Sequence, residues 1–109
     1  MRSIPYDRLV ELFSSIIPAR EAAVLVAVML NFALSRESLV LIFNIPWSEL
    51  SEVVGKLRER GVLRYANSLY RVDMDGVRRL IAEKRKEVER WKKSIEELEN
   101  LVLKDESWK

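Results

Sequence analysis

Apolar residues recur at helical spacing along most of the chain, and this spacing predicts two helices before residue 33. The first begins at Pro5, whose fixed φ suits the start of a helix, and it ends before Pro18. The second covers residues 19–32 and is apolar nearly all round, which predicts the central helix of a core. The apolar face of the first helix is formed by Leu9, Val10, Leu12 and Phe13.

Two further helices are predicted on either side of a short turn. The first covers residues 36–43, with Ser35 suited to cap its start and Asn44 suited to follow its end. The second begins at Pro46 and ends before Gly61, a good C-cap residue. The inner face of this second helix carries apolar residues at helical spacing, namely Leu50, Val53, Val54 and Leu57.

The period of the pattern then changes to that of β-strands. Residues 62–65 and 69–72 are two short runs rich in β-branched and aromatic side chains. Three residues separate them, and among these Asn67 suits a tight turn. The runs therefore predict a small β-hairpin, after which Asp73 or Asp75 is expected to cap the last helix.

Residues 77–102 are predicted to form one amphipathic helix with a seven-residue apolar repeat, the pattern of a coiled coil. The residues expected to form a dimer interface are Val77, Ile81, Val88, Trp91, Ile95, Leu98 and Val102. Lys84 and Trp91 interrupt the repeat, so the pattern favours a dimer without deciding between parallel and antiparallel helices. In the alternative, the helix folds back on its own domain.

Charge is unevenly distributed, although the net charge of the chain is only +2. Residues 76–93 hold eight basic and three acidic side chains, whereas residues 94–109 hold two basic and five acidic ones. This asymmetry is an argument for antiparallel pairing, because the basic half of one helix then meets the acidic half of the other. The basic cluster is either a solvated helix face with acidic partners at i,i+4 or an extension of a DNA-binding surface.

The composition argues against an enzyme. The chain contains no His and no Cys, which removes the commonest general base, the thiolate nucleophile and the commonest metal ligands. No Gly-rich phosphate loop is present, and no carboxylate spacing indicates a metal site. We therefore expect no catalytic residues, no cofactor and no metal. The longest apolar run is too short to span a bilayer, and we expect a cytoplasmic protein without membrane partners.

The middle of the chain carries a series of short motifs in a fixed order. They are Ser35-x-x-x-Leu39, Asn44-Ile45-Pro46, Leu50-Ser51-x-x-Val54-x-x-Leu57, Arg60-Gly61-Val62-Leu63 and Leu69-Tyr70-Arg71-Val72. Their combination resembles the archaeal TrmB-like and MarR-like winged helix-turn-helix transcriptional regulators over about residues 18–72. The short TrmB-like members similarly end in a dimerising helix, and nothing here matches the sugar-binding domain of the longer members.

The resemblance implies a mainly α fold with a small β-hairpin. A winged helix-turn-helix domain would cover residues 1–73, and a coiled-coil dimerisation helix would cover residues 74–109. The helix that begins at Pro46 would lie in the DNA major groove, and the hairpin would form the wing. The residues implied at the DNA interface are Trp47, Ser48, Glu49, Ser51, Glu52, Lys56, Arg58, Arg64, Asn67 and Arg71. Among these, Ser51 matches a position that commonly contacts phosphate in MarR-like proteins.

Three features of this region allow other interpretations. Glu49 and Glu52 can accept a hydrogen bond from cytosine, but they repel the phosphates that supply most DNA affinity. Trp47 either covers the end of its helix or exposes its ring to a thymine methyl or a protein. Leu41 and Ile42 belong to an apolar run on a short helix, so one of them is expected to face outward, against the N-terminal helix or a protein partner.

The expected function is that of a homodimeric transcriptional regulator whose partners are double-stranded DNA and a second copy of the chain. Two alternatives remain open. One is an architectural chromatin protein that binds duplex DNA without sequence preference. The other is a winged-helix module that binds a protein partner and no DNA.

Overall fold

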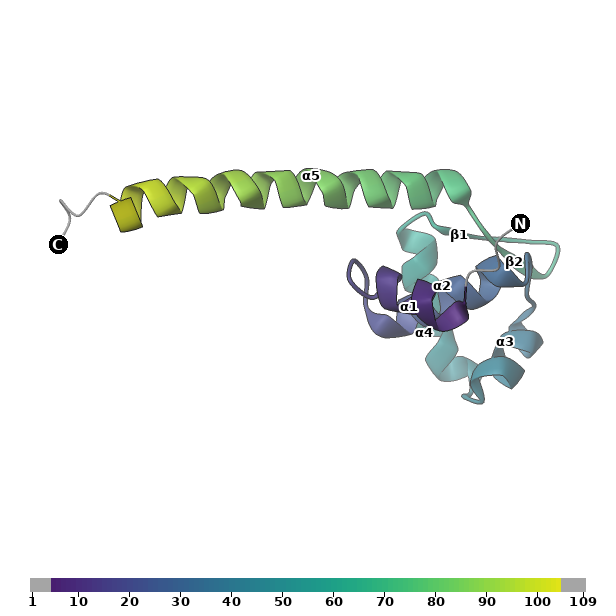
Figure 1. Ribbon diagram of the computed structural model, residues 1–109. Helices are drawn as coiled ribbons and strands as arrows, with labels where there is room; N and C mark the ends of the chain where they lie inside the picture. The colour runs from purple at the N-terminus through teal and green to yellow at the C-terminus, as the bar shows by residue number, and fades with distance from the viewer. Residues whose placement is uncertain (1–4, 105–109) are drawn as a thin grey trace.

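The computed structural model describes residues 5–104, which form a mainly helical protein with a two-stranded antiparallel sheet and a long C-terminal helix (Figure 1). The elements in chain order are α1 (Tyr6–Phe13), α2 (Ala19–Leu30), α3 (Arg36–Phe43), α4 (Trp47–Glu59), β1 (Leu63–Ala66), β2 (Leu69–Val72), α5 (Met74–Leu98) and the π-helical segment η1 (Glu99–Lys104). Helices α1 to α4 and the hairpin form a body at one end of the molecule. Helix α5 starts on this body and projects far beyond it.

Helix α2 lies at the centre of the body, as its apolar sequence predicts, and α1, α4 and β2 contact it. It ends at Leu30, two residues earlier than predicted, because the backbone of Phe32 is left-handed with φ 64°. The side-chain amide of Asn31 donates a hydrogen bond to the carbonyl of Ala27 and closes the last turn. The chain is then free to extend through Leu34, which forms a bridge to Tyr70 in β2.

The boundaries of α3 and α4 follow from local interactions that the sequence indicates. Ser35 caps α3, since its hydroxyl oxygen accepts a hydrogen bond from the amide of Ser38. Asn44 ends α3 with a left-handed backbone, and α4 begins directly after Pro46. At the other end of α4, the amides following Arg60 bond back to the carbonyls of Leu57 and Arg58. Gly61 permits this motif because its φ is +77°.

The hairpin is tighter than the sequence suggests. Its turn consists of two residues, Asn67 and Ser68, both with positive φ, whereas a three-residue separation was expected. Two successive left-handed residues match the natural twist of a hairpin, so Ala66 remains in β1 and pairs with Leu69. Val62 precedes β1 and is buried in the core.

The first turns of helix α5 pack against the body, and the rest of the helix is exposed to solvent. The carboxylate of Asp73 accepts a hydrogen bond from the amide of Gly76 and so caps its start, and Val77 and Leu80 are buried in the core. The α-helix ends at Leu98, and η1 continues it with a wider winding in place of the α-helix predicted to residue 102. No helix within residues 5–104 is both long and apolar enough to cross a bilayer.

The projection of α5 makes the chain elongated. The radius of gyration is 18.9 Å and the longest dimension is 63 Å. A compact domain of this length would have a radius of gyration of about 13 Å. Most of α5 therefore has no contact with the body of its own chain, and its apolar residues lie in water.

The angle at which α5 leaves the body depends on a contact between two glycines. A Cβ on Gly76 would lie 1.8 Å from the carbonyl oxygen of Gly61, which is backbone and has little freedom to move. Only a residue without a side chain lets the first turn of α5 approach the end of α4 so closely.

We predict that Gly76→Ala lowers the free energy of unfolding by at least about 2 kcal/mol, because the added methyl group collides with backbone. Gly55→Ala is the matched control, since a Cβ there meets nothing within 4 Å. It lies in the interior of α4 and should raise stability by about 1 kcal/mol, the helix propensity of alanine over glycine. Urea denaturation followed by circular dichroism measures both changes, and equal effects would contradict the prediction.

Candidate nucleic-acid interface

The outer face of the hairpin carries two arginines directly opposite each other. Arg64 in β1 pairs in register with Arg71 in β2, and both side chains are exposed. Like charges at directly opposed positions destabilise an antiparallel pair. The Asp73 carboxylate lies 3.9 Å from the Nε atom of Arg64 and balances the charge only in part. The hairpin therefore presents a site where an anion such as a phosphate would be stabilising.

Aromatic rings and guanidinium groups form a row of contacts, with tilted ring planes, that links the inner face of the hairpin to α3 and α4. Tyr65 and Tyr70 face each other with ring centroids 4.5 Å apart, and the Tyr70 ring lies 6.0 Å from that of Trp47 in α4. The Arg36 guanidinium from α3 lies 4.7 Å from the Trp47 ring, and that of Arg58 lies 6.0 Å from the Tyr65 ring. Each cation over an aromatic face is attracted by the ring quadrupole.

This row holds the hairpin against α3 and α4. Burial raises the pKa of Tyr70 above 10, and the neighbouring Tyr65 raises it further, while Arg36 and Arg58 act in the opposite direction. The phenol is therefore neutral at ordinary pH. Trp47, in the first turn of α4, is half-buried and packs against the core.

The exposed front of α4 lies opposite its buried residues Leu50, Val54 and Leu57. Helical spacing places Ser48, Glu52 and Glu59 on that front. The front is therefore acidic, and Arg58 and Lys56 stand to either side of it rather than on it.

The two flanks of α4 hold the remaining predicted residues. Glu49 and Lys56 are exposed and line a cleft beside Arg20 and the start of α2, and Glu52 at the edge of the front also lines this cleft. Ser51 is half-buried, and its hydroxyl donates a hydrogen bond to the carbonyl of Ser48. Asn67 lies at the exposed hairpin turn. The predicted DNA-binding residues are thus divided among the front of α4, its two flanks and the hairpin.

An ion pair between a buried carboxylate and a partly exposed guanidinium group joins the end of α4 to α2. Glu21 is 3% exposed, and its carboxylate accepts a hydrogen bond of 2.6 Å from the Nε atom of Arg60. Sequence reasoning missed this pair. The signal was a carboxylate within a helix that is otherwise apolar nearly all round, since such a group is almost never buried without a partner.

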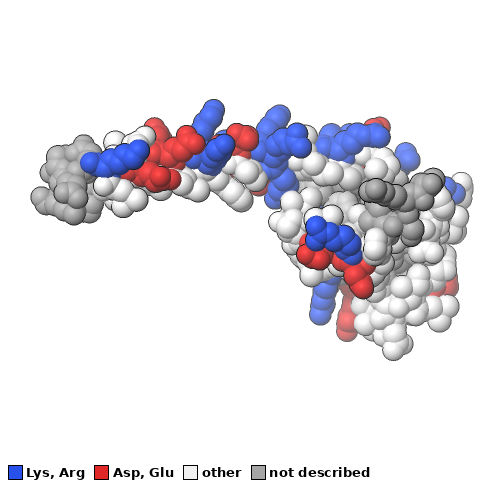
Figure 2. All heavy atoms as spheres, in the orientation of Figure 1, with Lys and Arg blue, Asp and Glu red and all other residues white. Residues whose placement is uncertain are grey.

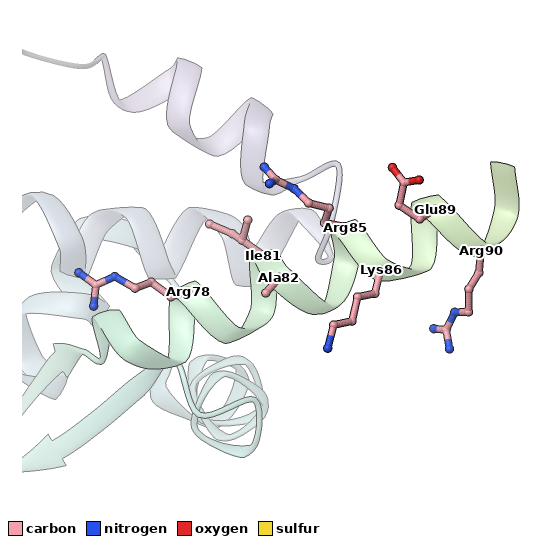
Figure 3. A pocket seen from close by; sticks show the side chains of 7 residues that line it. All are labelled: Arg78, Ile81, Ala82, Arg85, Lys86, Glu89 and Arg90. Atoms are coloured by element: carbon pink, nitrogen blue, oxygen red, sulfur yellow. The ribbon is translucent and has the colours of Figure 1, made fainter. Parts of the chain in front are cut away.

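Basic side chains extend along the first half of α5. One flank of the helix forms a shallow groove whose lining consists of Arg78, Ile81, Ala82, Arg85, Lys86, Glu89 and Arg90 (Figure 3). On the face seen in Figure 2, charged side chains gather mainly along the upper edge of the projecting part of α5, and uncharged ones along much of its underside. Ion pairs within the helix are spaced i,i+3, as in Arg78–Asp75 and Lys84–Glu87, rather than the expected i,i+4.

The residues predicted for dimerisation fall into two groups. Val77 is 3% exposed and packs in the core of its own domain, so its side chain is already covered. The others lie on α5 beyond the core, or on η1, and are exposed. They are Ile81, Val88, Trp91, Ile95, Leu98 and Val102.

Comparison with protein-family models, curated proteins and solved structures finds no match to this chain. Within residues 5–104, no three residues of the types His, Cys, Asp and Glu are placed to hold a metal ion. The geometry of the hairpin, α4 and α5 is therefore the basis for any assignment of function.

We predict that Arg60→Met lowers stability by about 2–3 kcal/mol, because it leaves the Glu21 carboxylate buried without its cation. The double variant Glu21→Leu/Arg60→Met should recover most of this loss, because it also removes the carboxylate that would otherwise be buried without a cation. Arg8→Met is the control. It breaks the exposed Arg8–Glu11 pair and should change stability by less than about 1 kcal/mol in the same urea titration. A double variant as unstable as the single one would contradict the assignment.

Proposed function

We propose that this chain is a homodimeric winged helix-turn-helix protein that binds double-stranded DNA and regulates transcription. The order of elements supports the fold. Helices α3 and α4 are joined by a short turn at the left-handed Asn44, and a hairpin follows α4 directly through Gly61. An isolated β-bridge between Leu34 and Tyr70 joins the chain after α2 to the edge of the hairpin. In the proposed winged helix-turn-helix, α4 would enter the major groove and the hairpin would flank it.

The observation that carries the DNA proposal is the cross-strand pair of Arg64 and Arg71. It places two guanidinium groups on the exposed face of the hairpin, at a cost in stability that a bound anion offsets. Phosphate oxygens suit this pair because guanidinium groups bind them in a bidentate manner. In this proposal the hairpin supplies phosphate contacts, which position the protein on the duplex.

The front of α4 supplies base contacts in the same proposal. Ser48 and Glu52 are exposed there, and a carboxylate can accept a hydrogen bond from the N4 amino group of cytosine. Such contacts add specificity rather than affinity, because the carboxylates repel phosphate. Affinity would then depend on the hairpin, on Arg58 and on the basic half of α5.

We predict that the double variant Arg64→Ala/Arg71→Ala binds duplex DNA more weakly and with a shallower dependence on salt. Each lost phosphate contact reduces the slope of log K against log salt by about 1. Fluorescence anisotropy with labelled random duplex, from low to physiological salt, measures both quantities. The control is Arg8→Ala on α1, an exposed arginine away from the hairpin and from α4, which should leave the slope unchanged.

Two results would argue against parts of the proposal. If wild-type protein binds no duplex even at low salt, DNA is not its partner. If it binds every duplex equally and no preferred site emerges from selection, it is an architectural DNA-binding protein rather than a regulator.

Dimerisation is the second part of the proposal, and it depends on the exposed residues of α5. Trp91 is 62% exposed, and Ile81, Val88, Ile95 and Leu98 share its face of the helix. We call these five residues the apolar stripe. An apolar face of this length in water indicates a partner, and a second copy of the same helix is complementary to it.

We predict that Ile95→Asp yields a monomer at low micromolar concentration, because it places a charge in the middle of the interface. Lys93→Asp introduces the same side chain on the opposite, charged face of α5 and should leave the dimer intact. Sedimentation velocity distinguishes the two species. A dimer that survives Ile95→Asp would locate the interface elsewhere.

Exposed apolar side chains on the body favour a second candidate function, binding of a protein partner. Phe32 is 84% exposed in a left-handed backbone conformation, and Leu41 is 82% exposed on the outer face of α3. Leu41 thus faces solvent rather than the N-terminal helix. Strained backbone that presents an aromatic ring to solvent is frequently functional. If Phe32→Ser/Leu41→Ser abolishes capture of a defined protein while DNA affinity is unchanged, this function stands beside the first.

A further inference from the structure

A groove with an entirely apolar lining lies in the angle between α1 and α5. Its volume is about 290 Å³, and it is lined by Leu9, Leu12, Phe13 and Ile16 on one side and by Ile81 on the other. Leu12 is 49% exposed, although it belongs to the apolar face of α1. A groove of this composition is suited to receive apolar side chains from another segment.

The groove is continuous with the apolar stripe, because Ile81 belongs to both. From Ile81 the stripe follows α5 outward to Leu98. At its far end, in η1, Leu101 and Leu103 are also exposed. One molecule therefore has an apolar groove at the base of α5 and an exposed apolar segment at the other end of this helix.

We propose that the groove of each protomer binds the Leu101–Leu103 segment of a second copy, in a dimer whose α5 helices run antiparallel. The inference rests on dimerisation through α5 and adds the direction of the helices and the part of the partner that docks. It also gives α1 a function, since this helix forms most of the groove.

The length of the stripe supports this arrangement. Ile81 and Leu101 are separated by about 30 Å at the helical rise of 1.5 Å per residue. Antiparallel helices that overlap over this whole length are centred near Trp91, and each Leu101 then lies beside the partner's Ile81. In a parallel dimer, each Ile81 would instead lie beside its own counterpart, and both Leu101 side chains would be about 30 Å from either groove.

The distribution of charge favours the same direction. Residues 76–93 carry eight basic and three acidic side chains, and Glu96, Glu97 and Glu99 follow them. Antiparallel helices place this acidic segment beside the partner's basic segment, for example beside Lys84. Parallel helices would place basic against basic and acidic against acidic, and charges that flank a coiled-coil interface set the orientation of the helices.

The direction of the helices is measured by the distance between two spin labels. The chain contains no Cys, so Asp75→Cys gives a single attachment site at the exposed start of α5. Antiparallel helices centred on Trp91 separate the two labels by about 48 Å, whereas parallel helices at the usual spacing hold them within about 20 Å. Double electron–electron resonance on the full chain, without DNA, distinguishes these distances.

Each outcome of this measurement has a definite meaning. A distance near 48 Å supports the antiparallel dimer. A short distance overturns it and leaves dimerisation itself intact. A monomer in sedimentation velocity overturns both the docking and the dimer, and because DNA is absent, none of these outcomes depends on DNA binding.

Charged substitutions in the groove and in the docking segment test whether these two regions meet. Leu12→Lys should raise the Kd of the dimer at least tenfold, and so should Leu101→Glu. The double variant Leu12→Lys/Leu101→Glu should recover much of this loss, since the new charges meet across the interface. Glu11→Lys, which adds the same side chain at the neighbouring exposed position, is the control and should leave the Kd unchanged. If Leu12→Lys also leaves it unchanged, or the double variant recovers nothing, the groove does not bind this segment.

Discussion

The contact between Gly76 and Gly61 sets the geometry on which the rest of this molecule depends. It brings the first turn of α5 against the end of α4, closer than any residue with a Cβ would allow. Val77 and Leu80 then enter the core, and α5 leaves the body in one direction, past α1. This close backbone contact therefore sets the position of the apolar stripe relative to the body. It also sets the position of the groove between α1 and α5.

The body is held together around α4 by two interactions of different kinds. On one side, the Glu21–Arg60 pair ties α4 to the start of α2. On the other, the row of rings from Trp47 to Tyr65 ties it to the hairpin. Between these two interactions, α4 exposes its acidic front, and the hairpin exposes its outer face with Arg64 and Arg71. In the proposed complex with DNA, the basic hairpin would anchor the protein on the phosphates, and the acidic front of α4 would supply selectivity.

Helix α5 serves two purposes along its length. Its first turns complete the core, and the remainder carries an apolar stripe and segregated charge into solvent. Because one rigid helix both completes the core and forms the proposed interface, the pairing of the two α5 helices would fix the orientation of one body relative to the other. The distance between two hairpins, and so the spacing of any two half-sites on DNA, would be set by the pairing of α5 rather than by the body itself.

Features that depend on near neighbours in the chain were determined by the sequence. Ser35 and Asp73 cap helices through residues three positions away, and Gly61 adopts the backbone that its position after α4 requires. The helical period placed Leu50 and Leu57 in the core, and the seven-residue repeat identified the stripe on α5. These are short-range effects, because they depend on residues that are only a few positions apart in the chain.

Tertiary structure decided the features that join distant segments. The early end of α2 at Leu30 accompanies the bridge from Leu34 to Tyr70, and Glu21 meets Arg60 across 39 positions. The need for glycine at position 76 comes from a carbonyl fifteen residues earlier in the chain. No local pattern encodes which distant backbone or cation lies nearby, because packing sets those neighbours. The sequence therefore determined the elements and their apolar faces, and only the fold decided which charges α4 exposes and which groove lies open beside α5.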